Sequence, residues 1–248
     1  MKIIACYSNK GGVGKTALAV NVAHGLAAAG QRVLLCDLDP QGASGFYFRV
    51  KASRKLKDEK FFRDVEKFTS AIRESDFQNL DILPANMTFR DFDVFLSRMK
   101  NSRSRLKKAL VAVDGDYDVI VLDCPPNIST LSESVFAASD LVMVPVIPTT
   151  LAERTFEQLA EFFRDHKIRR NKMRAVFSMV QSNKTLHKET MARMRDQYGK
   201  RILETTIPFS TDVEKMGVQR LPVACYAGTR PAGKAYADLV DEIRTRLA

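Results

Sequence analysis

Residues 10–16 read KGGVGKT and lie between the apolar segment 3–7 (IIACY) and residues 15–29, whose apolar spacing is typical of a helix. A glycine-rich loop that joins a strand to a helix is the context that a phosphate-binding loop requires. Glycines let successive backbone N–H groups turn toward phosphate oxygens, and the helix adds the positive end of its dipole. We therefore expect a nucleotide phosphate site at this loop.

Different side chains of the predicted site are expected to bind the phosphates and the metal. Lys15 supplies an ammonium group for the β- and γ-phosphates, and the Thr16 hydroxyl is placed to ligate Mg²⁺. A glycine-rich turn that binds nothing is the alternative, and the complete order of strand, loop, Lys-Thr and helix argues against it. The residues expected to bind the nucleotide are Lys10, Gly11, Gly12, Val13, Gly14, Lys15, Thr16 and Ala17.

Three carboxylates follow two further apolar segments. Residues 117–126 (YDVIVLDCPP) predict a strand ending at Asp123, where a carboxylate would hold Mg²⁺ through a water ligand. Residues 32–42 (RVLLCDLDPQG) place Asp37 and Asp39 at the end of another strand, and ligands of open parallel sheets bind outside that edge. Alternation would send both side chains to the same side, so either could reach the metal or orient an attacking water. An aspartate at a strand end is otherwise a turn former.

The whole chain alternates short aliphatic segments with helical patterns, which predicts an α/β fold with a mainly parallel twisted sheet flanked by helices on both faces. We expect one domain over residues 1–248, with a charged surface loop or insertion at about 49–60 (RVKASRKLKDEK). The predicted strands are 3–7, 32–37, 80–83, 119–123, 141–146, 175–180 and 202–207. The predicted helices are 15–29, 61–72, 89–99, 129–138, 152–166, 186–198, 211–216 and 232–247.

Composition limits the location and the partners. No apolar run approaches the roughly 18 residues that span a bilayer, and no signal-peptide pattern precedes the first strand, so we expect a cytoplasmic protein. The 39 Lys and Arg against 29 Asp and Glu give a net charge of +10, which favours polyanionic partners. The four cysteines show no metal-ligand spacing, so we expect buried free thiols at Cys6, Cys36, Cys124 and Cys225.

Together, KGGVGKT, DLDPQG and YDVIVLDCPP resemble the three nucleotide motifs of the ParA/MinD family of deviant Walker A P-loop ATPases, and specifically its ParA (Soj-like) branch. The similarity continues through residues 79–85 (NLDILPA), 137–145 (AASDLVMVP) and 206–208 (TIP). It covers nearly the whole chain. The chain begins at the phosphate strand, without the N-terminal helix-turn-helix of larger partition ATPases, so specific operator binding is not expected.

The resemblance implies roles for individual residues. Lys10 matches a signature lysine that reaches across an ATP-sandwich homodimer to the partner's phosphates, where a second cation would neutralise developing charge. Lys15 and Thr16 match the phosphate lysine and the Mg²⁺ residue. Asp39 falls on the carboxylate that supports hydrolysis, which makes Lys10, Lys15 and Asp39 the catalytic set, while Asp37 lies close to the metal. Ala17 replaces a second threonine that many relatives carry.

The resemblance also implies partners. ParA-like proteins bind nonspecific double-stranded DNA as ATP dimers, coat the nucleoid and are released when a ParB-like or other adaptor protein stimulates hydrolysis. Lys200, Arg201 and Arg230 fall near family positions that contact DNA, and Arg220 and Lys234 are their neighbours. Basic residues gather in four runs, 98–108, 164–174, 184–201 and 220–234, and each run alone could be a solvated helix face.

Three alternatives stay open on the sequence. A MinD-like membrane-associated positioning ATPase would need an amphipathic tail, and none follows the predicted helix 232–247. A metabolic ATP-dependent enzyme on the same scaffold, such as an amide- or ring-forming ligase, would need a further catalytic constellation. An electron-transfer ATPase similar to the nitrogenase iron protein would need a second cysteine to match Cys124.

Overall fold

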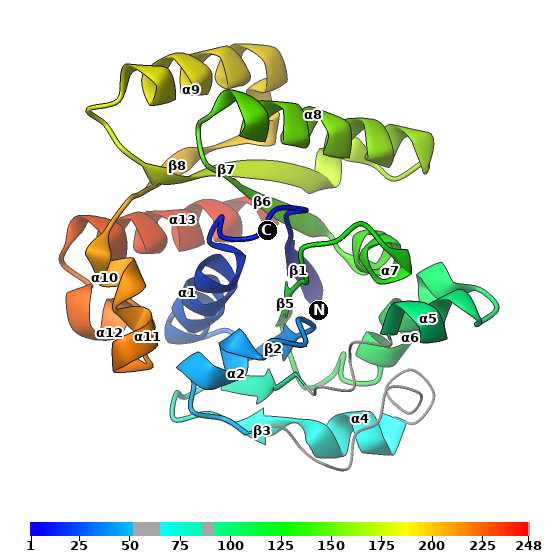
Figure 1. Ribbon diagram of the computed structural model, residues 1–248. Helices are drawn as coiled ribbons and strands as arrows, with labels where there is room; N and C mark the ends of the chain where they lie inside the picture. The colour runs from blue at the N-terminus through cyan, green and yellow to red at the C-terminus, as the bar shows by residue number, and fades with distance from the viewer. Residues whose placement is uncertain (52–64, 86–91, 248) are drawn as a thin grey trace.

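The computed structural model describes residues 1–51, 65–85 and 92–247 (Figure 1). The predicted charged insertion at 49–60 lies outside the described residues from residue 52 onward. The same holds for the first residues of the helices predicted at 61–72 and 89–99.

One mainly parallel sheet organises this part of the chain. Eight strands pair in the order β3-β4-β2-β5-β1-β6-β7-β8, all in parallel except β3, which is antiparallel to β4. This confirms the predicted sheet and adds the two-residue strand β3. The strands are β1 (Lys2–Cys6), β2 (Val33–Asp37), β3 (Arg73–Glu74), β4 (Leu80–Leu83), β5 (Val119–Asp123), β6 (Leu141–Val146), β7 (Met173–Val180) and β8 (Ile202–Pro208).

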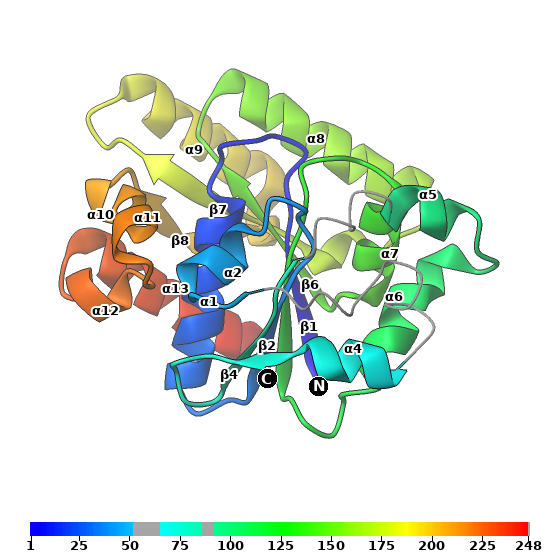
Figure 2. The same ribbon diagram turned by 60° about the horizontal axis from the view of Figure 1, so that its bottom comes forward.

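Helices cover both faces of the sheet, as predicted, and Figures 1 and 2 show the two helical layers. One layer consists of α1 (Lys15–Ala28), α2 (Ala43–Tyr47), α10 (Thr211–Glu214), α11 (Met216–Gln219), α12 (Ala224–Ala227) and α13 (Pro231–Leu247). The other layer consists of α4 (Val65–Ala71), α5 (Phe92–Ser97), α6 (Ser102–Val111), α7 (Thr130–Ala138), α8 (Thr150–Asp165) and α9 (Thr185–Tyr198). The single-turn helices η2 (Arg170–Lys172) and η3 (Gly199–Arg201) directly precede β7 and β8.

The two faces of the sheet carry separate cores, and strand β1 shows why. Ile3 and Ala5 pack into the core under α4 to α9, while Ile4 and Cys6 pack into the core under α1 and α13. Successive side chains of a strand point to opposite faces, so a strand buried on both faces reads as an unbroken apolar run. The central strands β1, β2 and β5 therefore lie in the interior of the molecule.

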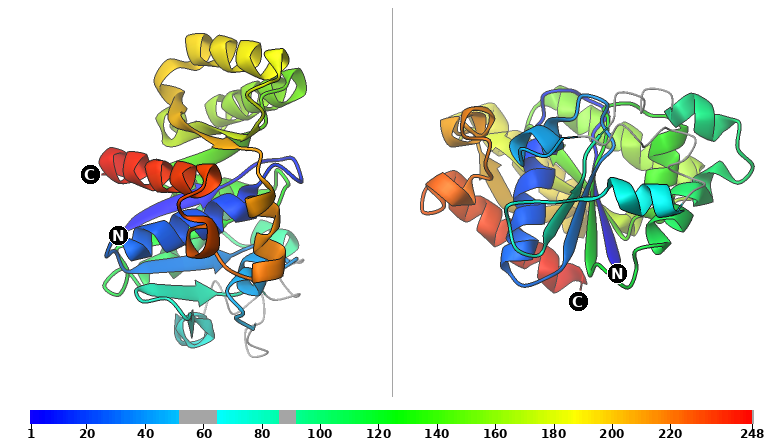
Figure 3. Two further views of the ribbon diagram at one scale, coloured as in Figure 1. Left: turned by 90° about the vertical axis from the view of Figure 1, so that its left-hand side faces the viewer. Right: turned by 90° about the horizontal axis from the view of Figure 1, so that it is seen from below.

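Helices α1 and α13 lie side by side over one face (Figure 3). Their contact is close because a Cβ on Gly25 of α1 would lie 2.6 Å from Cγ2 of Val240 on α13. Asn21 of α1 is also buried there, and its side-chain amide donates to Sδ of Met216 at 3.3 Å. Its carbonyl oxygen accepts the backbone N–H of Val223 at 2.8 Å. The first helix thus holds the chain between α11 and α12.

Several sequence expectations are corrected by the structure. The helix predicted at 211–216 is two short helices, α10 and α11, and α2, α6 and α12 were not predicted. Cys6, Cys36 and Cys124 are buried free thiols as expected, whereas Cys225 is exposed. Cys225 lies on the short helix α12 and not beside a strand, and its sulfur is 3.7 Å from Nε2 of His24. The apolar residues around Cys225 therefore belong to a surface helix.

Gly233 offers a test of the packing around α13. A Cβ at this position would lie 2.6 Å from Cα of Gly228 and would also collide with the backbone oxygen of Ala227. We expect Gly233→Ala to lower the free energy of unfolding by about 1–3 kcal/mol, because rigid backbone atoms must move. Urea unfolding followed by circular dichroism measures the change.

The matched control is Gly217→Ala in α11, where nothing lies within 4 Å of the new Cβ. Alanine is the better helix former by about 1 kcal/mol, so this variant should be neutral or slightly more stable. Equal stability of the two variants would contradict the close packing at Gly233.

Candidate nucleotide-binding site

The glycine-rich loop connects the carboxyl end of β1 to the start of α1. Gly12 and Gly14 adopt φ values of 73° and 92°, a left-handed region that favours glycine. A Cβ on Gly14 would also lie 3.2 Å from Oγ of Ser178. No side chain caps the first turn of the 14-residue helix α1. Its free N–H groups and dipole make the loop a site for an anion.

Lys15 lies across this loop with its ammonium group largely removed from water. The residue is 8% exposed, and Nζ donates to the backbone oxygen of Lys10 at 3.1 Å. Burial lowers the pKa of Lys15, and the charges of Asp123 and Asp39 oppose that shift. A buried ammonium with one carbonyl partner is well suited to an incoming phosphate group.

Asp123 lies at the end of β5, directly beside Asp37 at the end of β2, because the two strands are in parallel register there. Asp123 is fully buried, and its Oδ2 accepts the hydroxyl of Ser44 at 2.7 Å. Its Oδ1 is buried without a hydrogen-bond partner among the described residues. Burial raises the pKa of Asp123 to about 6, although hydrogen bonds from Ser44 and Thr16 favour the charged form.

This orphaned oxygen gives a test of whether a cation fits. A buried carboxylate oxygen without a donor costs free energy unless a cation or a water supplies one. Thr16 is among the groups that favour the charged form of Asp123, which brings a hydroxyl and a carboxylate to the same site. Oxygen donors are the ligands of Mg²⁺, which keeps several waters and binds few protein groups. The residues present therefore fit Mg²⁺.

The described residues contain no group of three or more His, Cys, Asp or Glu side chains that could hold a metal by themselves.

Asp37 and Asp39 differ in burial, although Asp39 lies close enough to act on the charges of Asp37, Asp123 and Lys15. Strand β2 ends at Asp37, which is fully buried and accepts the backbone N–H groups of Asp39, Ser44 and Gly45. Its pKa is raised by burial and then by Asp123. Asp39 is partly exposed, and its Oδ1 accepts the N–H of Gln41 at 3.0 Å. Asp37 shapes the turn, whereas Asp39 faces the open side.

Lys10 projects from the loop toward α8. Its Nζ donates to the backbone oxygen of Leu151 at 3.0 Å, in an exposed contact. Leu151 is itself 69% exposed at the first turn of α8. The Lys10 ammonium therefore makes a solvent-exposed contact, whereas the Lys15 residue is mostly buried.

Two parts of the site were missed by the sequence analysis. Ser44, which donates to Asp123, follows the motif DPQG, and no pattern distinguished it from other turn serines. A small pocket of about 50 Å³ lies beside Gly14 and Ala17 and is bounded by Pro208 and Phe209. In the sequence, only the resemblance of residues 206–208 (TIP) to the family pointed to this region.

The five predicted DNA residues do not form one cluster. Lys200 and Arg201 lie in η3 at the amino end of β8, whereas Arg220, Arg230 and Lys234 lie beyond its carboxyl end. Arg230 is paired with Asp212 at 3.0 Å, and Arg220 donates to the backbone oxygen of Phe46 at 3.0 Å. Two of the five are therefore engaged in contacts within the chain.

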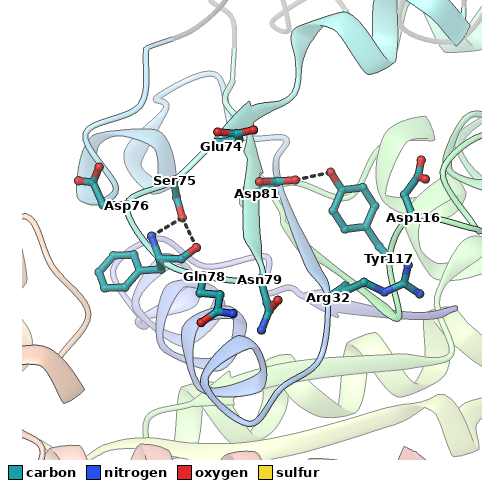
Figure 4. Close-up of a pocket in the computed structure, with 10 residues that line it drawn as sticks. Arg32, Glu74, Ser75, Asp76, Gln78, Asn79, Asp81, Asp116 and Tyr117 are labelled. Atoms are coloured by element: carbon teal, nitrogen blue, oxygen red, sulfur yellow. Dashed lines mark hydrogen bonds between the residues drawn. The ribbon is translucent and has the colours of Figure 1, made fainter.

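Another pocket, of about 400 Å³, lies at the opposite edge of the sheet, where β2, β4 and β5 begin. Figure 4 shows that Glu74, Asp76, Asp81 and Asp116 line it, with the hydroxyl of Tyr117 donating to Asp81 at 2.7 Å. An acidic surface of this kind repels phosphate groups. It is not part of the nucleotide site.

Comparison with known proteins agrees with the geometry of the site. A family model described as an AAA domain matches residues 1–176. The sporulation initiation inhibitor protein Soj of Bacillus subtilis is 30% identical, over 98% of this chain and 98% of its own. Chromosome partitioning protein ParA of Caulobacter vibrioides is 27% identical, over 99% of this chain and 95% of its own.

Solved structures agree over the same length. Cobyrinic acid a,c-diamide synthase from Mycobacterium smegmatis, with a bound ATP analog and magnesium, is 26% identical with a TM-score of 0.82, and the match covers 100% of this chain and 96% of that one. An ATP complex of a Cyanothece McdA variant is 18% identical with a TM-score of 0.87, over 98% and 96% of the two chains. The second likeness concerns the fold alone.

The hydrogen bond from Ser44 to Asp123 gives a test of the buried acid. We expect Ser44→Ala to lower the free energy of unfolding by about 1–3 kcal/mol near neutral pH, because a buried carboxylate loses its donor. Ser97→Ala is the control, since that hydroxyl bonds only to a carbonyl of its own helix and is exposed. Equal urea unfolding curves for wild type and both variants would contradict the stabilising role of the bond.

Proposed function

This chain belongs to the ParA/MinD family of P-loop ATPases, and on that premise we propose that it is a ParA-type positioning ATPase that binds and hydrolyses ATP with Mg²⁺. It forms one ATPase domain over residues 1–248. The observation that carries the proposal is the meeting of a buried ammonium, Lys15, and an unpartnered buried carboxylate oxygen, on Asp123, at one uncapped helix. A phosphate group would bind the ammonium of Lys15, and Mg²⁺ would bind at the unpartnered oxygen of Asp123.

The phosphate groups occupy the loop formed by residues 10–17. Backbone N–H groups from Gly11 to Ala17 bind phosphate oxygens, and Lys15 neutralises the β- and γ-phosphates. Thr16 and Asp123 hold Mg²⁺, with Asp37 supporting the turn beside it. Mg²⁺, when bound, withdraws charge from the transferred phosphoryl group. The nucleoside end of ATP continues from the loop past Gly14 and Ala17, where Pro208 and Phe209 bound a small pocket.

Hydrolysis depends on two residues outside the phosphate cradle. Asp39 orients the attacking water, because it is the one partly exposed carboxylate of the three. Lys10 reaches the partner's phosphates in an ATP-sandwich homodimer, and its ammonium, whose bond to the backbone oxygen of Leu151 is solvent-exposed, can exchange that carbonyl for a phosphate oxygen. A cation supplied in trans makes hydrolysis depend on assembly.

The assembled dimer binds nonspecific double-stranded DNA of the nucleoid and releases it after hydrolysis. A net charge of +10 supports a polyanionic partner, and two chains together double the basic surface. A ParB-like or other adaptor protein stimulates hydrolysis at the cargo. The relatives named as partition proteins support a segregation or positioning role.

A metabolic role is the second candidate, because the synthase from Mycobacterium smegmatis shares the fold at 26% identity. The proposed DNA binding distinguishes the two, since an amide-forming ligase needs no basic surface for a duplex. A membrane-associated role has less support. Among the described residues, no helix is long and apolar enough to cross a bilayer.

Asp39 gives a test of the hydrolytic role. We expect Asp39→Ala and Asp39→Asn to bind ATP like the wild type, to hydrolyse it at least tenfold more slowly and to remain on DNA, because a positioned acid-base group contributes about 10²–10⁴-fold. The asparagine variant keeps an acceptor for the N–H of Gln41, so it removes the charge of Asp39 without removing the hydrogen bond that shapes the loop. Lys15→Ala is the comparison, and it should abolish nucleotide binding. Phosphate release and nucleotide titration measure both, and an unchanged hydrolysis rate at Asp39 would remove its assignment.

Binding to unrelated duplex DNA, measured with ATP and with ADP across a salt series, tests the function as a whole. We expect tighter binding with ATP and a steep loss of affinity with salt, with log K falling by about 0.9 per phosphate contact for each tenfold increase. Equal binding with ATP and with ADP would contradict the proposed control of DNA binding by ATP. No binding with either nucleotide would favour the metabolic candidate.

A further inference from the structure

Three basic segments that are distant in the sequence meet at one edge of the sheet. Helix η2 directly precedes β7 and η3 directly precedes β8, and these two strands are parallel neighbours, so both helices lie at the edge where the strands begin. This edge is opposite to the carboxyl ends of β1, β2 and β5, where the nucleotide site lies. We call the following residues the amino-edge basic rim: Lys107, Arg169, Arg170, Lys172, Arg174, Lys200 and Arg201.

The charges of the rim act on one another across three elements. The pKa of Lys172 is lowered by burial, and Lys107 on α6 and Arg169 lower it further against the effect of Asp140. The pKa of Arg174 is also lowered by burial, and then by Arg246 and Arg201. Cations that lower one another's pKa lie within the range of electrostatic repulsion. Because β7 and β8 begin side by side, the basic residues of η2 and η3 lie on one surface, and Lys107 of α6 lies near enough to Lys172 to repel it.

No rim residue forms an ion pair with any residue that the structure describes. Asp140 acts on Lys172 and accepts the backbone N–H of Ile3, and two further acidic groups nearby are engaged elsewhere. Glu242 binds Arg246 and the backbone N–H groups of Glu204 and Thr205, and the Glu204 side chain pairs with Arg195.

Arg174, within the rim, also has no ion pair with a described residue. Its Nη1 donates to the backbone oxygens of Asn171 and Met173, but its Nε is buried and has no hydrogen-bond partner among the described residues. With Asp140 acting on Lys172, the seven cations still leave a net positive surface, which a polyanion would neutralise.

The shape and composition of the rim decide among anionic partners. A small phosphate compound needs a cradle, and no rim residue lines the pocket beside Gly14 or the pocket of Figure 4. An acidic peptide needs apolar anchors, and of the large apolar side chains that are exposed only Val111 of α6 belongs to the same elements. A duplex backbone needs neither, because regularly spaced phosphates bind an extended row of Lys and Arg.

We propose that the amino-edge basic rim binds the phosphate backbone of duplex DNA, and this inference rests on the DNA binding proposed above. The rim takes the place of the mixed set of Lys200, Arg201, Arg220, Arg230 and Lys234. Of these, Lys200 and Arg201 belong to the rim. Arg230 forms an ion pair with Asp212, and Arg220 donates to the backbone oxygen of Phe46. The acidic pocket on the same edge, at β3 to β5, limits the duplex to the β6–β8 side.

The test compares two triple variants with the same change in charge. The rim variant is Lys107→Ala, Arg170→Ala and Lys200→Ala, three exposed side chains. The control variant is Lys188→Ala, Lys215→Ala and Lys234→Ala, which are equally exposed but lie outside the rim and include one residue of the earlier set. Fluorescence anisotropy with a labelled duplex, with Mg²⁺ and ATP, gives the dissociation constant across a salt series. Thermal melting checks the folding of each variant.

We expect the rim variant to bind at least tenfold more weakly at about 0.1 M salt, with a salt slope lower by about 2.7, or 0.9 for each lost phosphate contact. The control variant should bind within about twofold of wild type, since its residues contact no phosphate. A charge-conserving variant, Lys107→Arg, Arg170→Lys and Lys200→Arg, should bind like wild type because phosphate contacts depend on charge more than on shape.

Other results would overturn the inference. If wild type binds DNA and the control variant loses binding while the rim variant does not, the duplex lies on the α10–α13 side. If the rim variant loses binding to polyglutamate but keeps DNA binding, the rim serves an acidic protein. If wild type binds no duplex with ATP, the proposed function itself fails.

Discussion

The parallel register of β1, β2 and β5 is the constraint on which the site depends. Cys6, Asp37 and Asp123 are aligned across the three strands, so the chain leaves each strand at the same level of the same edge. The glycine-rich loop, the turn after Asp37 and the carboxylate of Asp123 then meet without any further folding of the chain. A one-residue slip of β5 would turn the Asp123 side chain to the other face of the sheet.

Burial makes the same groups costly when nothing is bound. Asp37 and Asp123 are neighbouring buried carboxylates, and the charge of Asp123 disfavours that of Asp37, while Lys15 is a mostly buried ammonium near Asp123. Opposite charges supplied by a ligand relieve all three groups at once. A ligand that binds only the folded chain adds its binding free energy to stability, so occupancy of this edge and stability of the central strands are linked.

The sequence predicted the central part of the molecule well and its periphery less well. The bounds of β4, β5 and β6 agree with prediction because buried strands appear as short aliphatic runs with clear ends. Helices α2 and α12 were missed because four or five residues show no periodicity, and Ser44 because its role depends on a strand 79 residues away. Strand order is a tertiary property, so the sequence could not show that Lys107, Lys172 and Lys200 share an edge or that Arg230 is engaged by Asp212.

The close approach of α1 and α13 at Gly25 has a mechanical consequence. No side chain of α1 separates the two helix backbones there, so Val240 has no room in which to absorb a displacement of α1. Helix α1 begins at the glycine-rich loop, and α13 lies against β8 through the contacts of Glu242 with the strand backbone. A displacement of the loop that moved α1 would therefore act on α13 and through it on β8. The missing methyl group at Gly25 thus connects the central strand β1 to the edge strand β8 through two packed helices.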